Sequence, residues 1–159
     1  MTIEDDIKVI WNPFDTERFN MNDVETDTGN YLFVGSYDYL RKNTIEELIK
    51  LAEKDEKKLI LVGRGYPEFE QEWVEIHEPC WDVEKYVKNC DAVASIKLGR
   101  TVFEGLLCGK PAFIYDIDEK GEILSFKIED SLKDIDLSLD IDSYIVADKI
   151  LEYANNKNK

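Results

Sequence analysis

The sequence holds few of the residues from which disulfide frameworks and metal sites are built. Its 159 residues include three cysteines and one histidine. Because Cys80, Cys90 and Cys108 are odd in number and show no CxxC spacing, we expect buried free thiols. Nothing in the spacing brings the three thiols and His77 together, so no zinc site is predicted. His77 and Cys80 lie so close in one extended segment that their side chains tend to point away from each other, so no Cys-His nucleophile pair is predicted either.

Positive charge is also scarce. The chain has 20 Lys and Arg against 35 Asp and Glu, a net charge of −15, which argues against a nucleic-acid partner. The longest apolar runs, at 59–62 and 112–115, are far shorter than the roughly 20 residues that cross a bilayer. Residues 1–6 are acidic where a secretion signal is basic. With 43% hydrophobic residues, the composition predicts a folded, cytoplasmic protein without a transmembrane segment.

Short β-rich runs alternate with amphipathic stretches along the chain. This order predicts an α/β fold, a Rossmann-like parallel sheet sandwiched by helices. We predict strands at residues 31–35, 58–63, 73–77, 91–96 and 111–116, with helices in several of the intervals. Beyond Gly121 we predict further extended segments at 123–128 and 135–141 and a closing helix at 143–155.

The predicted helices carry start and stop signals. Thr44 and Glu47 have the spacing of a capping box, and Asp82 is placed to cap the next helix. A helix at 101–108 is predicted to end at Gly109, the C′ residue. Apolar stripes at helical spacing are formed by Ile45, Leu48, Ile49 and Ala52 and by Val83, Tyr86, Val87 and Cys90.

Glycines and cations follow several predicted strands. In an open parallel sheet, ligands bind at the carboxyl ends of the strands, so these positions favour an anion site. The alternative is that each glycine merely ends a strand and each cation is solvated surface. The residues are Gly35, Ser36, Arg41 and Lys42 after the first strand, Gly63, Arg64 and Gly65 after the second, and Lys97, Gly99, Arg100 and Thr101 after the fourth.

Glu104 is the acidic residue nearest to this edge. It lies on the predicted helix after Arg100, where a carboxylate can accept hydrogen bonds from two ribose hydroxyls. An ordinary surface glutamate explains the spacing equally well. No Walker phosphate loop, no GxGxxG fingerprint and no Ser-His-Asp arrangement accompanies it.

Several segments occur in a characteristic order along the chain: 9–19 (VIWNPFDTERF), 33–35 with 41–43 (FVG, RKN), 61–65 (LVGRG), 82–86 (DVEKY) and 103–111 (FEGLLCGKP). Taken together, they resemble the carboxyl-terminal, nucleotide-sugar-binding half of retaining glycosyltransferases of the B fold. This is the large family (family 4-like, glycosyl transferases group 1) that includes sucrose synthases and lipopolysaccharide mannosyltransferases. The similarity covers nearly the whole chain, and its strongest element is the stretch that contains Glu104.

The resemblance implies a function for the predicted site. Glu104 would bind the ribose of a UDP- or GDP-sugar, Lys42 or Arg41 its diphosphate, and backbone amides near Arg100 and Thr101 its phosphate oxygens. Arg100 and Lys42 would be the catalytic cations of a hexosyltransferase-like reaction in polysaccharide biosynthesis, without a metal or other cofactor. The remaining predicted donor-binding residues are Gly35, Ser36, Gly63 and Arg64.

The resemblance also implies a division of the chain and a partner. Residues 1–22 look like an interdomain linker, and residues 23–159 look like the donor-binding domain. An enzyme of this fold has two such halves, so the acceptor-binding domain, or a partner subunit that supplies it, would be required. We expect the chain alone to be inactive, whether it is a fragment or a natural stand-alone half.

Two positions depart from the family's pattern. Ile96 stands where the first glutamate of the usual pair contacts the transferred sugar, and Ser36 stands where an arginine commonly contacts the phosphates. These departures keep a second interpretation open, a non-catalytic interaction module. Such a module would bind its partner through residues 7–19, including Trp11 and Phe14, and through the last helix.

Overall fold

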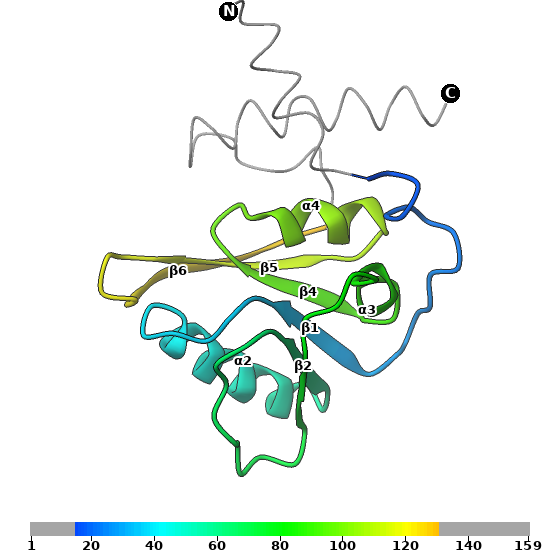
Figure 1. Ribbon diagram of the computed structural model, residues 1–159. Coiled ribbons are helices and arrows are strands. Elements are labelled where there is room, and N and C mark those ends of the chain that lie inside the picture. Colours follow the sequence, from blue (N-terminus) through cyan, green and yellow to red (C-terminus); the bar gives the residue numbers. More distant parts are fainter. Residues whose placement is uncertain (1–14, 131–159) are drawn as a thin grey trace, which may run out of the picture.

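The computed structural model describes residues 15–130, which form an α/β domain with one mixed sheet. The predicted segment 135–141, the predicted helix 143–155 and Trp11 and Phe14 lie outside the described residues. The sheet has six strands in the order β3-β2-β1-β4-β5-β6 (Figure 1). The strands are β1 (Asn30–Val34), β2 (Lys58–Val62), β3 (Val74–His77), β4 (Ala92–Ile96), β5 (Ala112–Ile117) and β6 (Ile123–Glu129). The helices are α2 (Lys42–Lys54), α3 (Glu84–Lys88) and α4 (Arg100–Leu107).

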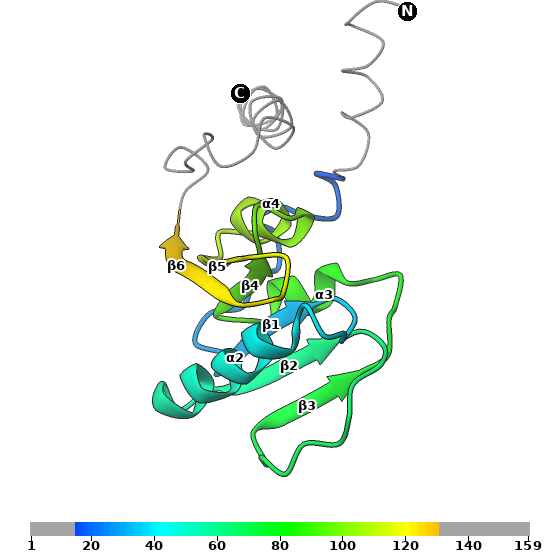
Figure 2. The ribbon, with the colours of Figure 1, turned by 90° about the vertical axis from the view of Figure 1, so that its left-hand side faces the viewer.

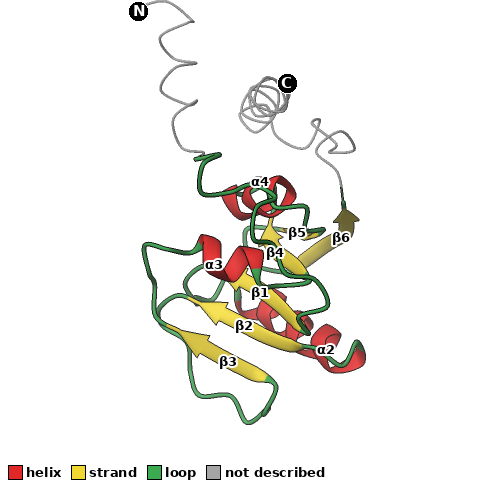
Figure 3. Cartoon of the chain, turned by 90° about the vertical axis from the view of Figure 1, so that its right-hand side faces the viewer, coloured by secondary structure: helices red, strands yellow, loops and turns green. Residues whose placement is uncertain are grey.

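The first five strands are parallel, as the alternating sequence predicts. Figure 3 shows the ends of β1, β2 and β3 pointing toward one edge of the sheet. The last strand, β6, pairs antiparallel with β5, so the sheet is mostly parallel. The connection after Ile117 is too short for a parallel crossover, which needs a dozen or more residues. It turns tightly instead, with Asp118 N–H donating to Glu122 O at 2.9 Å and Gly121 at a φ of +82°.

Helices cover both faces of the sheet, which explains why the central strands are apolar throughout. On β1, Tyr31 and Phe33 pack with the buried stripe of α2, whereas Leu32 packs on the opposite face with Val87 of α3 and Phe103 of α4. Figures 1 and 2 show α2 on one side of the sheet and α3 and α4 on the other. The predicted stripe of α2 is confirmed, since Ile45, Leu48, Ile49 and Ala52 are all buried.

Two predicted helix caps are wrong. The helix α2 begins at Lys42, so Thr44 lies inside its first turn, is fully buried, and has no hydrogen-bond partner for Oγ1. The side chain that binds the backbone just before this helix is Asp38, whose Oδ1 accepts a hydrogen bond from the Arg41 N–H at 3.0 Å. At α3 the capping position is Val83, with no side-chain cap from Asp82. The predicted end of α4 at Gly109 agrees with the structure, since Gly109 has a φ of +74°, in the left-handed region that favours glycine.

The cysteines are free thiols, but only two are buried. Cys90 and Cys108 lie in the core, and burial raises their pKa to about 12 and about 11, which keeps them protonated. Cys80 was predicted buried and is exposed, because the loop after β3 leaves the sheet. Within residues 15–130 no helix is long and apolar enough to cross a membrane.

Candidate functional site

Two adjoining cavities open at the carboxyl ends of the parallel strands. The large cavity, of about 890 Å³, lies over β1, β4 and the turn after β5. The small cavity, of about 440 Å³, lies over β1, β2 and the loop after β3. Val34, Gly35, Arg100 and Thr101 line both cavities. The shared wall therefore sits where β1 and β4 neighbour each other, the point of strand-order reversal at which doubly wound sheets bind ligands.

The helix α4 presents its N-terminus to both cavities. Its capping residue is Gly99, in extended conformation and without a side-chain cap. A Cβ at Gly99 would come within 2.8 Å of Ser95 Oγ, so the glycine allows the loop to turn tightly over β4. The positive end of the helix dipole and Arg100 together favour an anion at this wall. Lys97 lines the large cavity with a φ of +59°, a backbone conformation that costs a lysine energy.

The glycines after β1 and β2 hold two loops together. Gly35 N–H donates to Val62 O at 2.9 Å, and Gly63 N–H donates to His77 O at 3.0 Å. These two amides are therefore used by the sheet and do not face a phosphate. A Cβ at Gly63 would lie 2.1 Å from Gly35 O, so only glycine permits the loops to approach this closely. Both glycines line the small cavity, and their amides take part in hydrogen bonds between the strand ends.

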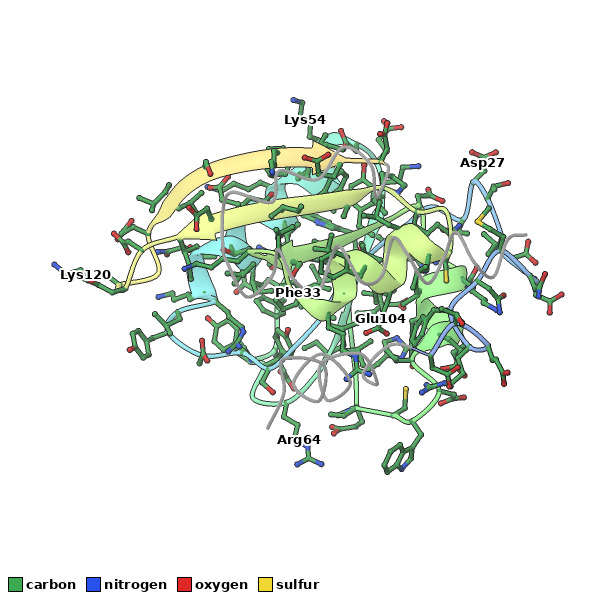
Figure 4. The ribbon with its side chains drawn as sticks, turned by 90° about the horizontal axis from the view of Figure 1, so that it is seen from above. Asp27, Phe33, Lys54, Arg64, Glu104 and Lys120 are labelled. Carbon is green, nitrogen blue, oxygen red and sulfur yellow. The ribbon has the colours of Figure 1, made fainter. Side chains whose placement is uncertain are left out.

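Glu104 lies at the base of the small cavity rather than on the surface. Only 7% of the residue is exposed, and its Oε1 is 3.2 Å from Arg100 Nε one turn earlier on α4. Burial raises the pKa of Glu104 to about 7, against the opposing effect of Arg100 and Arg18. Figure 4 shows Glu104 on α4. A buried carboxyl group that opens into a cavity can accept hydrogen bonds from a ligand.

Arg18 belongs to this site and was not predicted from the sequence. Its guanidinium pairs with Glu84 of α3, with Nε at 3.1 Å from Oε2, and Nη2 also donates to the backbone oxygen of Trp81. This pairing raises the pKa of Arg18 and lowers that of Glu84. The neighbouring Phe19 is buried in the core. The segment assigned to a linker therefore forms one wall of the small cavity.

Most of the predicted donor-binding residues do line the cavities. Arg41 lines the large one, although its guanidinium pairs with Asp38. Lys42 begins α2, is exposed and lines neither cavity. Arg64 is likewise exposed and lies at the periphery in Figure 4. The residues that line one or both cavities as predicted are Gly35, Ser36, Arg41, Gly63, Arg100, Thr101 and Glu104.

Two acidic residues in the turn after β5, Asp118 and Glu119, also line the large cavity. With Asp116 at the end of β5, Asp118 has an Asp-x-Asp spacing, of a kind that can serve cation binding, and the prediction of a metal-free site overlooked it. Asp118 lines the cavity, but its Oδ1 accepts the N–H groups of Lys120 and Glu122, both at 2.9 Å. Among the residues that the structure describes, no three His, Cys, Asp or Glu side chains are grouped to hold a metal ion.

The small cavity has two chemically different walls. One is polar and contains Ser36, Arg100, Thr101 and Glu104. The other is largely apolar and is built by Phe19, Val62, Pro79, Trp81 and Val83. A ligand that fits this arrangement has a flat or apolar end, hydroxyl groups in the middle and an anionic end.

No protein-family model matches the chain, and no curated protein matches it either. The fold and the site define its class: an α/β protein with a Rossmann-like sheet and a two-part cavity at the carboxyl edge of its parallel strands. Because one such fold hosts many functions, the function must be argued from the site.

Proposed function

We propose that the chain is the donor-binding half of a glycosyltransferase and binds a nucleotide diphosphate sugar. The observation that carries the proposal is the buried Glu104 at the base of a cavity whose shared wall is the N-terminus of α4. A carboxylate for ribose hydroxyls and a cationic helix end for phosphates are the two contacts that a nucleoside diphosphate requires. The resemblance of residues 103–111 to the family's strongest motif supports the same ligand.

The cavity walls order the ligand along one direction. The ribose lies against Glu104, and the diphosphate lies over the shared wall at Arg100 and Thr101. The base then points toward the apolar wall of the small cavity, and the sugar enters the large cavity beside Lys97. This order follows from the chemistry of each wall, because every group of the ligand meets a complementary surface.

The reaction we propose breaks the bond from the anomeric carbon to the diphosphate oxygen and forms a bond to an acceptor hydroxyl oxygen. The leaving nucleoside diphosphate takes the proton of that hydroxyl. Fixed donors and cations that stabilise the leaving diphosphate supply most of such catalysis. Arg100 and the first turn of α4 serve this purpose at the shared wall. Arg41 lines the large cavity and is better placed than the exposed Lys42 to contribute a second cation.

Titration calorimetry with UDP, GDP and ADP tests donor binding. We expect heat with at least one of them, and the strongest binder identifies the base. Glu104→Ala should abolish that heat with the circular dichroism spectrum unchanged, whereas Arg64→Ala, an exposed arginine outside both cavities, should leave it intact. Absence of heat with all three nucleotides at millimolar concentration would refute the proposal.

Catalysis is tested by adding the acceptor-binding half. The chain alone should transfer no sugar, because the acceptor site is supplied by the other half. With that half present, we expect transfer that survives EDTA and falls about ten-fold or more in Arg100→Ala, the loss expected for one transition-state cation contact. Efficient sugar transfer by the chain alone would contradict this mechanism. Abolition by EDTA of the transfer seen with both halves would contradict its metal-free part.

A non-catalytic interaction module remains the second candidate. Ile96 lacks the carboxylate and Ser36 lacks the guanidinium that the resemblance assigns to sugar and phosphate contacts. The strand β6 exposes the apolar side chains of Leu124, Phe126 and Ile128. Exposed apolar surface of this kind marks protein contacts. A module predicts that Glu104→Ala changes no nucleotide binding, while Phe126→Ser weakens association with the partner protein.

A further inference from the structure

We propose that Trp81 is the platform on which the nucleobase of the bound nucleotide stacks. The proposal rests on the proposed function, since it assigns the base end of the same ligand. It goes beyond the sequence prediction, in which no residue was assigned to the base. The structure places a large, exposed aromatic ring among the apolar residues that line the small cavity, beside an arginine, Arg18, whose guanidinium is paired with Glu84.

Trp81 is exposed to an unusual degree. Its exposed fraction is 94%, the highest of the large exposed hydrophobic residues between positions 15 and 130, although it lines the small cavity. An indole usually buries much of its area, because that area contributes strongly to stability. Trp81 contributes little to the folded core, so its place in the structure calls for another explanation.

The backbone beneath the ring is held in place. Arg18 Nη2 donates to the Trp81 carbonyl oxygen and pairs at the same time with Glu84, which ties the loop after β3 to α3. Pro79 restricts the chain two residues earlier. The backbone that carries the ring is therefore anchored, so that only two side-chain torsions have to be ordered when a ligand binds. Aromatic side chains on such supports bind ligands at low entropic cost.

The position of Trp81 matches the base end of the ligand. Glu104, Arg100 and Thr101 form the polar wall and take the ribose and the phosphates. Trp81, Pro79 and Val83 belong to the apolar lining of the same cavity, so we expect a nucleotide that meets the polar residues to direct its base toward them. Stacking on an indole suits any base, because each base has a π face.

The test compares ligands with and without a base. The full chain, Trp81→Ala and Trp81→Phe are titrated with UDP, GDP, ADP and inorganic pyrophosphate. We expect Trp81→Ala to weaken the best-bound nucleotide about five-fold or more, the lower end expected for loss of one base stack. Its pyrophosphate affinity should stay unchanged, and Trp81→Phe should retain most of the nucleotide affinity. Tyr39→Ala, which removes an exposed ring that lines neither cavity, is the control.

Fluorescence gives a second measurement. Nucleotide binding should change the tryptophan emission of the native chain, and Trp81→Phe should lose most of that change. Nucleotide affinity equal to the native value in Trp81→Ala would overturn the stacking proposal and leave the donor-binding function intact. An equal loss for pyrophosphate would also overturn it, because the ring would then be supporting the loop. Weaker association with the acceptor-binding half, with nucleotide affinity unchanged, would assign Trp81 to a protein interface instead. A native chain that binds no nucleotide would refute both proposals.

Discussion

Replacing Glu104 with glutamine should make the protein more stable above pH 7 while it weakens binding of the proposed ligand. Burial raises the pKa of Glu104 from 4.5 to about 7. The folded protein therefore holds a proton that the unfolded chain releases between these two values. The free energy of unfolding consequently falls as the pH rises through this window and stays low above it.

The size of the effect follows from the pKa. One pKa unit corresponds to about 1.4 kcal/mol, so the ionised carboxylate costs the folded state on the order of 3 kcal/mol at pH 8. Glutamine has nearly the same shape and carries no charge, so it removes this cost. At pH 4 the native carboxyl is already neutral, and the substitution should change stability little.

Urea denaturation followed by circular dichroism measures the difference. We expect Glu104→Gln to raise the free energy of unfolding by a few kcal/mol at pH 8 and by much less at pH 4. Glu68→Gln, at an exposed position, should stay within about 0.5 kcal/mol of the native protein at both values, as surface substitutions generally do. A gain of the same size at both pH values, or a loss at pH 8, would refute this account of Glu104.

The same variant connects stability with function. The amide of glutamine has one acceptor oxygen, whereas a carboxylate can accept from both ribose hydroxyls. Glu104→Gln should therefore bind the best nucleotide more weakly, although the protein itself is more stable. Native affinity should rise between pH 6 and pH 8 as the carboxyl ionises. If the variant is more stable but binds the nucleotide as tightly as the native chain, Glu104 does not contact the ligand.

Two further substitutions test the packing that supports the site. Asp91 is partly buried, which opposes ionisation, but hydrogen bonds from Lys57 and Thr28 hold its pKa at about 2. Asp91→Asn should therefore lower the free energy of unfolding, measured by urea denaturation, by about 2 kcal/mol at pH 7 and by much less at pH 2. An equal loss at both pH values would contradict this link between the Asp91 pKa and stability. Gly105→Ala should lower the melting temperature, because a Cβ there would lie 2.5 Å from Val93 Cγ2 and overpacking costs about 1–3 kcal/mol. Val93→Ala should restore part of the loss in the double variant, and its failure to do so would place the strain elsewhere.

Sequence reasoning located the strands and the main helices because their signals are local. The stripe Ile45 to Ala52 repeats at helical spacing, and the run at 59–62 ends at a glycine, so each can be recognised within a few residues. It also brought Gly35, Arg100 and Glu104 to one edge, because parallel strands all end there. The caps at Thr44 and Asp82 failed because several nearby residues can cap a helix, and tertiary packing selects among them.

Which side chains meet across long distances was decided only by the tertiary structure. Arg18 reaches Glu84 across 66 residues of chain, and no periodicity encodes that pairing. The burial of Glu104, on which its pKa depends, arises in the tertiary structure, where Phe19 packs in one core cluster with Val102 and Phe103 of α4. The sequence determined the helices, the strands and the edge of the sheet where the candidate site lies, since these follow from apolar residues that repeat every 2 residues in strands and every 3.6 residues in helices. The electrostatics of the site and the exposure of Trp81 depend on which elements the folded chain places side by side.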